Sequence, residues 1–282
     1  MFVISVHYLM SYLSCNDRIT GTKRPAVDLD EEEMPGLKNP TKPPKKAVSR
    51  KELVVTIDEY QIFSDEMANL RNGVEINATI VYAMATLIRQ KMKNDVCGFV
   101  DQEELSKPSY GGMFSGDNEG KTGIQIHYNG QGHFLTSSFN QSDEVVRLWD
   151  SLAQPVSQNL KLQLFSLYGS GKDSIQYTYE SVRKQSNLVN CGVHAIVFAH
   201  DLAVDGGVRS FYVGKELRIW TEVCLMRREI SILQRRPEHS ARRGSILVGE
   251  TITKQWFDQN SDRIEGYSEL FAGFQARADQ NY

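Results

Sequence analysis

Three strand-like runs follow one another in the middle of this chain of 282 residues, at 124–128, 133–139 and 145–150. Asn129-Gly130 stands between the first two runs, and this dipeptide is typical of the tight turn that joins two antiparallel strands. Strands joined by such short connections usually lie next to each other in one sheet. The pattern therefore predicts a sheet as the framework of the fold.

Helical segments flank this predicted sheet along the sequence. Between residues 76 and 92, apolar side chains such as Ile80, Met84 and Leu87 recur at helical spacing. Further elements are expected as strands at 53–57 and 175–179, as helices at 160–168 and 191–202, and as a polar, glycine-rich loop at 102–120. Helices that flank a central sheet of mixed or antiparallel strands define the α+β class, which is the predicted fold class.

The composition changes at both ends of this region, which divides the chain into one domain and two extensions. Residues 1–52 are expected to be an N-terminal extension or linker, mostly disordered, because five of the eight prolines and separate acidic and basic runs fall within it. Its basic run fits a solvated linker, a nuclear import signal or a docking arm. Residues 53–226 are expected to fold. Residues 227–282, which carry paired arginines, are expected to be a basic, partly disordered extension with one short helix near 252–257.

Charge and cysteine content narrow the possible functions. With a net charge of −3, the whole chain has no general attraction to nucleic acid or to anionic membranes, so neither is expected as a partner. The apolar run at residues 1–14 is too short to span a bilayer. The four cysteines are widely spaced and form no CxxC pair, so neither a metal site nor a disulfide framework is expected. No cofactor is expected either. Reduced thiols are typical of the nucleus or cytoplasm, where this protein is expected.

Cys191 is the first candidate for a reactive group. It follows the polar stretch 185–190 and begins a helix whose next residues are mostly apolar. The free N–H groups and positive dipole end of a helix N-terminus favour a thiolate, the nucleophilic form of cysteine. Gly192, directly after it, would let a substrate backbone approach closely. From this local pattern alone, Cys191 fits an inert buried thiol equally well.

His133 and Asp150 are the candidates for groups that act on this thiol. His133 begins a strand directly after Gly132, and Asp150 ends the next strand, so neighbouring strands would bring the two side chains together. A histidine so placed can act as a general base, and a carboxylate behind it can hold the imidazole in one orientation. Each residue alone also fits a structural role, His133 as a polar edge histidine and Asp150 as a turn former.

The other histidines and cysteines fit structural roles better. His127 lies on the preceding strand and should point elsewhere, and His194 follows Cys191 by three residues, beside the helix backbone rather than opposite the thiol. Cys97 and Cys224 are interpreted as core thiols.

Three motifs around the candidate residues occur together in one known family. GHFLTSS contains His133, LWDSL contains Asp150, and QSNLVNCG contains Gln185 and Cys191. In this order they resemble the ubiquitin-like-protein (SUMO-type) cysteine proteases, a family with adenain-like catalytic domains, and especially its mobile-element-associated branch. The resemblance covers about residues 75–225. It implies that 53–226 form a catalytic domain of papain-like architecture, with the nucleophile at a helix N-terminus.

The resemblance implies a role for each residue of these motifs. Cys191 would attack the carbonyl carbon of a C-terminal glycine. His133 would take the thiol proton and return it to the leaving amine, and Asp150 would orient His133. Gln185, six residues before the cysteine, would donate its side-chain amide to the developing oxyanion.

Three further residues are expected to contact the substrate, namely Gly132, Phe134 and Gly192. Phe134 stands where the family has a tryptophan that lines a narrow tunnel for a Gly-Gly tail. The family's N-terminal Trp-Leu-x-Asp stretch has no clear equivalent, and Asn190 replaces the aspartate before the nucleophile.

The implied activity is that of a cysteine peptidase or isopeptidase that cleaves after the C-terminal glycine of a ubiquitin-like modifier, in SUMO-like deconjugation or precursor processing. Its expected partners are such a modifier or its conjugates. Two alternatives follow from the same pattern: a degenerate protease that still binds a modifier, and an acyltransferase with the same catalytic arrangement.

Overall fold

The structure is a computed structural model, and it describes residues 51–92, 95–100, 105, 118, 120–140, 142, 144–208, 212–233 and 249–261. All of these belong to the unit Ser49–Tyr282. The expected N-terminal extension and the expected loop at 102–120 lie almost entirely outside the described residues. The same is true of 234–248 and 262–282 in the expected C-terminal extension. Among the described helices, none combines the length and the apolar character needed to cross a membrane.

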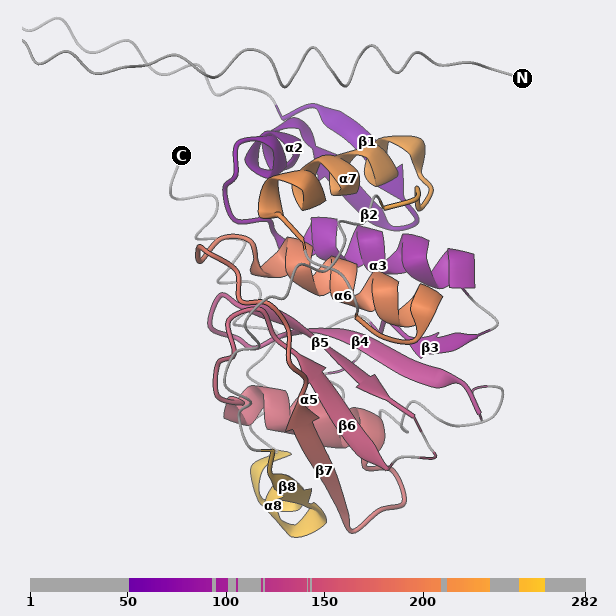
Figure 1. The fold of residues 1–282 in the computed structure, drawn as a ribbon, viewed down its shortest axis with the longest axis vertical. Helices are drawn as coiled ribbons and strands as arrows, with labels where there is room; N and C mark the ends of the chain where they lie inside the picture. The colour runs from indigo at the N-terminus through magenta and orange to yellow at the C-terminus, as the bar shows by residue number, and fades with distance from the viewer. Residues whose placement is uncertain are drawn as a thin grey trace, which may run out of the picture. The chain divides into compact units, whose positions relative to one another are not determined.

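Six strands form the main sheet, in the order β3-β4-β5-β6-β7-β8 (Figure 1). They are β3 (Val96–Gly98), β4 (Thr122–Tyr128), β5 (Phe134–Phe139), β6 (Val145–Trp149), β7 (Ser174–Tyr179) and β8 (Thr251–Thr253). The β3–β4 and β6–β7 pairs are parallel and the other pairs are antiparallel, so the sheet is mixed. The β4–β5 turn contains Gly130 at a φ of 79°, a backbone conformation that glycine adopts without strain.

Helices cover both faces of this sheet. One face carries α3 (Ala78–Met92) and α6 (Cys191–Asp205), and the other carries α5 (Gln158–Tyr168) with α8 (Lys254–Asn260). Alternate side chains of β5 enter the two cores in turn, so that Phe134 packs on the α3–α6 side and Leu135 on the α5 side. The Thr136 hydroxyl donates to the Ala195 carbonyl at 2.8 Å and ties α6 to β5. This arrangement confirms the predicted α+β class.

A second layer packs on the side of α3 and α6 that faces away from the sheet (Figure 1). It consists of the antiparallel pair β1 (Leu53–Ile57) and β2 (Tyr60–Phe63) with α2 (Ser64–Arg71) and α7 (Gly214–Arg227). Helix α7 contacts α2, α3 and α6. An ion pair of 2.7 Å between Arg71 and Glu222 links α2 to α7 at the surface. The layer therefore places side chains of α7 close to the beginning of α6.

The main sheet includes residues from beyond position 226, where the sequence analysis ended the folded domain. Strand β8 pairs with β7 through Ile175 and Ile252, and Ile252 is buried. The short helix expected near 252–257 is α8, whose Phe257 ring stacks on Phe165 of α5 with the centroids 4.8 Å apart. A strand of three residues is too short to show a period of two, which is why sequence patterning missed β8.

Candidate active site

His133 lies at the end of a tightly bonded turn between β4 and β5. The Asn129 side-chain oxygen accepts hydrogen bonds from the N–H groups of Gln131 (2.8 Å) and His133 (3.2 Å). The Asn129 N–H donates to the His133 carbonyl at 3.0 Å, and the Gly132 N–H donates to the Tyr128 hydroxyl at 3.0 Å. These bonds fix the backbone that carries the imidazole.

The structure brings His133 and Asp150 into contact, because β5 and β6 are neighbours in the sheet. His133 Nε2 donates to Asp150 Oδ1 at 2.7 Å, and both side chains are 2% exposed. The backbone N–H groups of Leu152 (2.7 Å) and Gln154 (2.8 Å) also donate to this carboxylate. Three donors satisfy the buried carboxylate as an anion and hold it against the imidazole.

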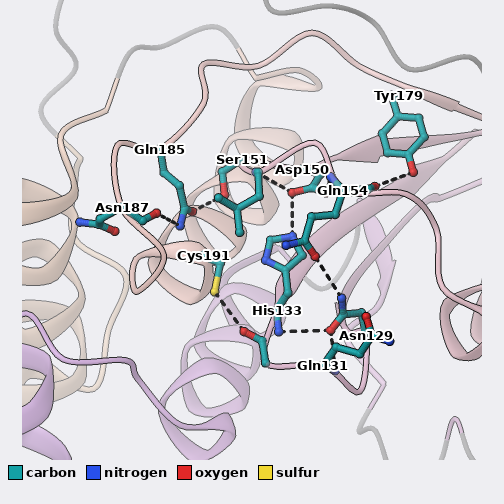
Figure 2. Close-up of polar contacts among 12 residues, drawn as sticks. Asn129, Gln131, His133, Asp150, Ser151, Gln154, Tyr179, Gln185, Asn187 and Cys191 are labelled. Atoms are coloured by element: carbon teal, nitrogen blue, oxygen red, sulfur yellow. Dashed lines mark hydrogen bonds and ion pairs between the residues drawn. The ribbon is translucent and has the colours of Figure 1, made fainter.

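Cys191 is the first residue of α6, and its thiol faces the imidazole from the side opposite Asp150 (Figure 2). The thiol donates to the carbonyl of Gly132 at 3.9 Å, so it lies against the turn that carries His133. In the described part of the chain, no hydrogen-bond partner reaches the buried His133 Nδ1, the ring nitrogen that Asp150 does not use. The imidazole therefore stands between a carboxylate and a thiol.

The environment of His133 sets its charge. Burial lowers the pKa of His133, but the hydrogen bond to Asp150, the interaction with the Cys191 thiol and the negative charges of both groups outweigh burial and raise the pKa to about 9. The imidazole is thus protonated at neutral pH. An imidazolium beside a cysteine favours the thiolate, the nucleophilic form of that residue.

Gln185 lies in the segment that leads into α6, and in the view of Figure 2 it is on the Cys191 side of the imidazole. The Ser151 hydroxyl donates to Gln185 Oε1 at 2.6 Å, and the Gln185 N–H donates to the Ser151 carbonyl at 2.9 Å. Gln185 Nε2 donates to the Asn187 carbonyl at 2.5 Å, which uses one of its two N–H bonds. Ser151, the residue after Asp150, thereby orients the amide.

Two of the residues expected to contact a substrate are instead packed in the interior. Phe134 is 3% exposed, and its ring centroid lies 5.1 Å from that of Tyr128. A Cβ atom on Gly192 would lie 2.7 Å from Cγ1 of Ile76, so the close approach of α6 to Ile76 requires a glycine there. Packing, rather than substrate approach, accounts for both residues in this structure. Gly132 is only partly buried, and its carbonyl contacts the thiol.

The other described histidines and cysteines do not join this arrangement. His127 is bonded into a buried side-chain network on the α5 side of the sheet, and burial lowers its pKa to about 4. Burial also lowers the pKa of His194 to about 4. Burial raises the pKa of the Cys97 thiol to about 11 and raises that of Cys224. Groups held neutral in this way are poor nucleophiles and bases at neutral pH.

Sequence reasoning missed three residues that support the site, namely Asn129, Ser151 and Arg218. Asn129 had a signal, because it begins the Asn-Gly turn, and Ser151 had one in the LWDSL motif. Arg218 Nε donates to the Asn190 side chain at 2.8 Å, directly before Cys191. Arg218 could have been noticed in the sequence as a charged residue on the face of α7 that is otherwise buried. Within the described part of the chain, no three His, Cys, Asp or Glu side chains gather to hold a metal ion.

Comparisons of sequence identify no relative, since no family model and no curated protein matches this chain. Solved structures do match. The C-terminal protease domain of Ulp1, solved in complex with Smt3, the yeast ortholog of SUMO, is 15% identical with a TM-score of 0.50. Ulp1 with its catalytic cysteine oxidised to a sulfonic acid is also 15% identical, with a TM-score of 0.52. Each match covers 64% of this chain and 90% of the other.

The chain has the fold of the Ulp1 protease domain. At 15% identity the likeness concerns the fold, and the arrangement of side chains is seen in this chain's own geometry. The Ulp1-type fold brings the β4–β5 turn, the end of β6 and the start of α6 to one place. Residues 17 positions apart (His133 and Asp150) and 59 positions apart (Gly132 and Cys191) are in contact there.

Proposed function

We propose that this protein is a cysteine peptidase or isopeptidase that cleaves after the C-terminal glycine of a ubiquitin-like modifier. The observation that carries the proposal is the imidazole of His133, buried between the carboxylate of Asp150 and the thiol of Cys191. The modifier as substrate is supported by the Ulp1-type fold, since one Ulp1 domain of this fold was solved in complex with Smt3. Membership of the mobile-element-associated branch and a nuclear or cytoplasmic location remain predictions.

The first half-reaction forms an acyl-enzyme. The Cys191 thiolate attacks the glycine carbonyl carbon, and the carbonyl oxygen becomes an oxyanion. Gln185 and the N–H groups at the start of α6, which have no acceptor within the helix, are the donors available to this oxyanion. When the C–N bond breaks, the His133 imidazolium gives its proton to the leaving amine, and a thioester on Cys191 results.

The second half-reaction releases the modifier. The now neutral His133 takes a proton from a water molecule, whose oxygen attacks the thioester carbonyl. The C–S bond then breaks and the thiolate–imidazolium pair is restored. The modifier leaves with a free C-terminal carboxyl group, which loses its proton to the solvent as a carboxylate. Asp150 keeps Nδ1 of the imidazole facing the thiol by holding Nε2 at 2.7 Å throughout.

The test is a modifier tail that ends in an electrophile, incubated with the intact protein and analysed by mass spectrometry. SUMO-type and ubiquitin-type tails are compared, and we expect a covalent adduct on Cys191 that disappears in Cys191→Ala. Cys224→Ala is the matched control, because it removes a buried thiol of raised pKa away from the site. Equal labelling of Cys191→Ala and the parent protein would sink the proposal.

A second candidate is a module that binds a modifier without turnover. Two observations favour it: Cys191 is 1% exposed, and Phe134 has almost no surface to offer a Gly-Gly tail. This candidate predicts that a modifier is retained in a pull-down by the parent and by Cys191→Ser alike, with no cleavage. Any Cys191-dependent cleavage of a modifier fusion rejects it.

A further inference from the structure

Arg218 is a buried arginine whose hydrogen bonds converge on the residues next to Cys191. It lies on α7 and is 5% exposed. Nε donates to the Asn190 side-chain oxygen at 2.8 Å, and Nη2 donates to the Val189 carbonyl at 2.9 Å. Val189 and Asn190 directly precede the nucleophile, so one guanidinium is hydrogen-bonded to both residues that come before α6.

The other edge of the same guanidinium is anchored in a different part of the domain. Nη1 donates to the carbonyls of Val74 (2.7 Å), Leu70 (3.2 Å) and Asn69 (3.4 Å), at and just after the end of α2. The planar, forked guanidinium can make such bonds in several directions at once, which an ammonium on a flexible chain cannot reproduce. Arg218 therefore bridges the end of α2 to the start of α6.

Asn190 depends on this bridge because little else in its own helix holds its side chain. It is the N-cap residue of α6, but its side chain makes no capping hydrogen bond. Instead it packs at the start of α7, where a Cβ atom on Gly214 would lie 2.0 Å from Asn190 Nδ2. The amide is thus held between Arg218 and the backbone of Gly214, and it belongs to the residue directly before the first turn of α6.

The charge of Arg218 is the second part of the argument. In the described part of the chain, its hydrogen-bond acceptors are four carbonyl oxygens and one amide oxygen, all of them neutral. A buried cation without a carboxylate partner favours a negative charge nearby. Burial lowers the pKa of Arg218 and the charge of Cys191 acts in the opposite direction, so the two groups interact electrostatically.

We propose that Arg218 is a positioning residue for the nucleophile. It holds Val189 and Asn190 so that Cys191 begins α6 facing His133, and its uncompensated positive charge stabilises the thiolate. The catalytic part of this inference rests on the proposed peptidase function, whereas the effect on the thiol does not.

The experiment measures two quantities for Arg218→Met and Arg218→Lys, after urea unfolding has shown that each variant is folded. The first is the pH midpoint of Cys191 alkylation by iodoacetamide, followed by peptide mass spectrometry. The second is kcat on a modifier fusion. Arg71→Met is the matched control, because it removes an arginine that links α2 to α7 through Glu222 at the surface, away from Val189 and Asn190.

We expect Arg218→Met to lower kcat at least about tenfold and to raise the alkylation midpoint by about one pH unit, a tenfold change in the equilibrium between thiol and thiolate. Arg218→Lys keeps a positive charge but lacks the forked guanidinium. Its alkylation midpoint should therefore lie close to that of the parent, whereas its kcat should stay close to that of Arg218→Met. Arg71→Met should change neither. The inference is overturned by a folded Arg218→Met whose kcat stays within about twofold of the parent and whose midpoint moves by less than about 0.3 pH units.

The alkylation readout also separates this inference from the proposed function, since it needs no modifier. A parent protein that cleaves no fusion refutes the peptidase, while an unmoved alkylation midpoint in Arg218→Met refutes the role of Arg218. If neither Arg218 variant folds, Asn190→Ala removes one of the two bonds that Arg218 makes before α6, while the bond to the Val189 carbonyl and the buried charge stay in place. It should lower kcat severalfold with the midpoint unchanged, and a parental kcat in Asn190→Ala overturns the positioning role.

Discussion

Replacing Asp150 by asparagine tests the central contact of the site with almost no change in shape. The carboxylate accepts from His133 Nε2 and the Leu152 N–H through Oδ1, and from the Gln154 N–H through Oδ2. An asparagine has only one acceptor oxygen, so its NH₂ group must face at least one of these donors. The variant therefore loses the negative charge next to the imidazole and leaves at least one of these three N–H groups without its acceptor.

The size of the effect follows from the pKa of His133. The ordinary value is 6.5 and the folded value is about 9, a difference that corresponds to about 3 kcal/mol. Without the carboxylate, burial is the largest influence left, and the pKa of His133 falls back to the ordinary value or below it. Loss of about 3 kcal/mol of imidazolium stabilisation predicts a fall in kcat of about 10²-fold at neutral pH. The lost hydrogen bond adds a stability loss of about 1 kcal/mol.

The assay is kcat against pH for the parent and Asp150→Asn on a modifier fusion, with urea unfolding to compare stability. The parent should keep its activity until the pH approaches about 9, where His133 loses its proton, and the variant should lose its residual activity at a lower pH. Asp201→Asn is the control, because Asp201 is another fully buried aspartate but lies beside His200 and Tyr212. If Asp150→Asn keeps kcat within about threefold of the parent and the same alkaline limit, the reasoning about the pair is refuted.

Three further predictions follow from the same structure. Gln185→Ala should lower kcat by about 10²–10³-fold with a smaller effect on KM, because it removes one donor to the oxyanion, and a variant affected only in KM would contradict this role. Gly192→Ala should lower the free energy of unfolding in urea by about 1–3 kcal/mol, because its Cβ atom would lie 2.7 Å from Ile76, and an unchanged stability would show that α6 can shift. The raised pKa of His133 adds stability in full below pH 6.5 that is lost as the pH rises to about 9, so the unfolding free energy should fall in that window by up to about 3 kcal/mol. Unfolding of His133→Gln should show no such fall, and the same slope in both proteins would assign it to another group.

The parts of the fold that the sequence predicted are those in which a local pattern decides the structure. The Asn129-Gly130 turn pairs β4 with β5 in the register Tyr128 to Phe134, and alternate burial along β5 follows from a period of two. The helix beginning at Cys191 starts where polar residues give way to apolar ones. Local sequence rules suffice for these elements because their conformation depends on residues that are neighbours in the chain.

The parts that the sequence did not predict depend on contacts between distant segments. Strand β8 forms through its pairing with β7, and the residues Thr251–Thr253 alone show no pattern that predicts a strand. Gly192 suggested space for a substrate, but the neighbour that requires a glycine is Ile76, more than a hundred positions earlier. Arg218 is recognisable as unusual on a buried helix face, yet its acceptors come from α2 and from the segment before α6.

In the proposed mechanism, the two cations near Cys191 do different work because of how each one is held. His133 is held by a carboxylate at 2.7 Å and can give its proton away, since a pKa of about 9 is within reach of the leaving amine. Arg218 is held by neutral oxygens and keeps its protons at any working pH, so it can stabilise the thiolate but cannot take part in proton transfer. Removing His133 should therefore abolish turnover and raise the pH at which Cys191 is alkylated, because both the proton donor and a cation beside the thiolate are lost, whereas removing Arg218 should only lower turnover and raise that pH.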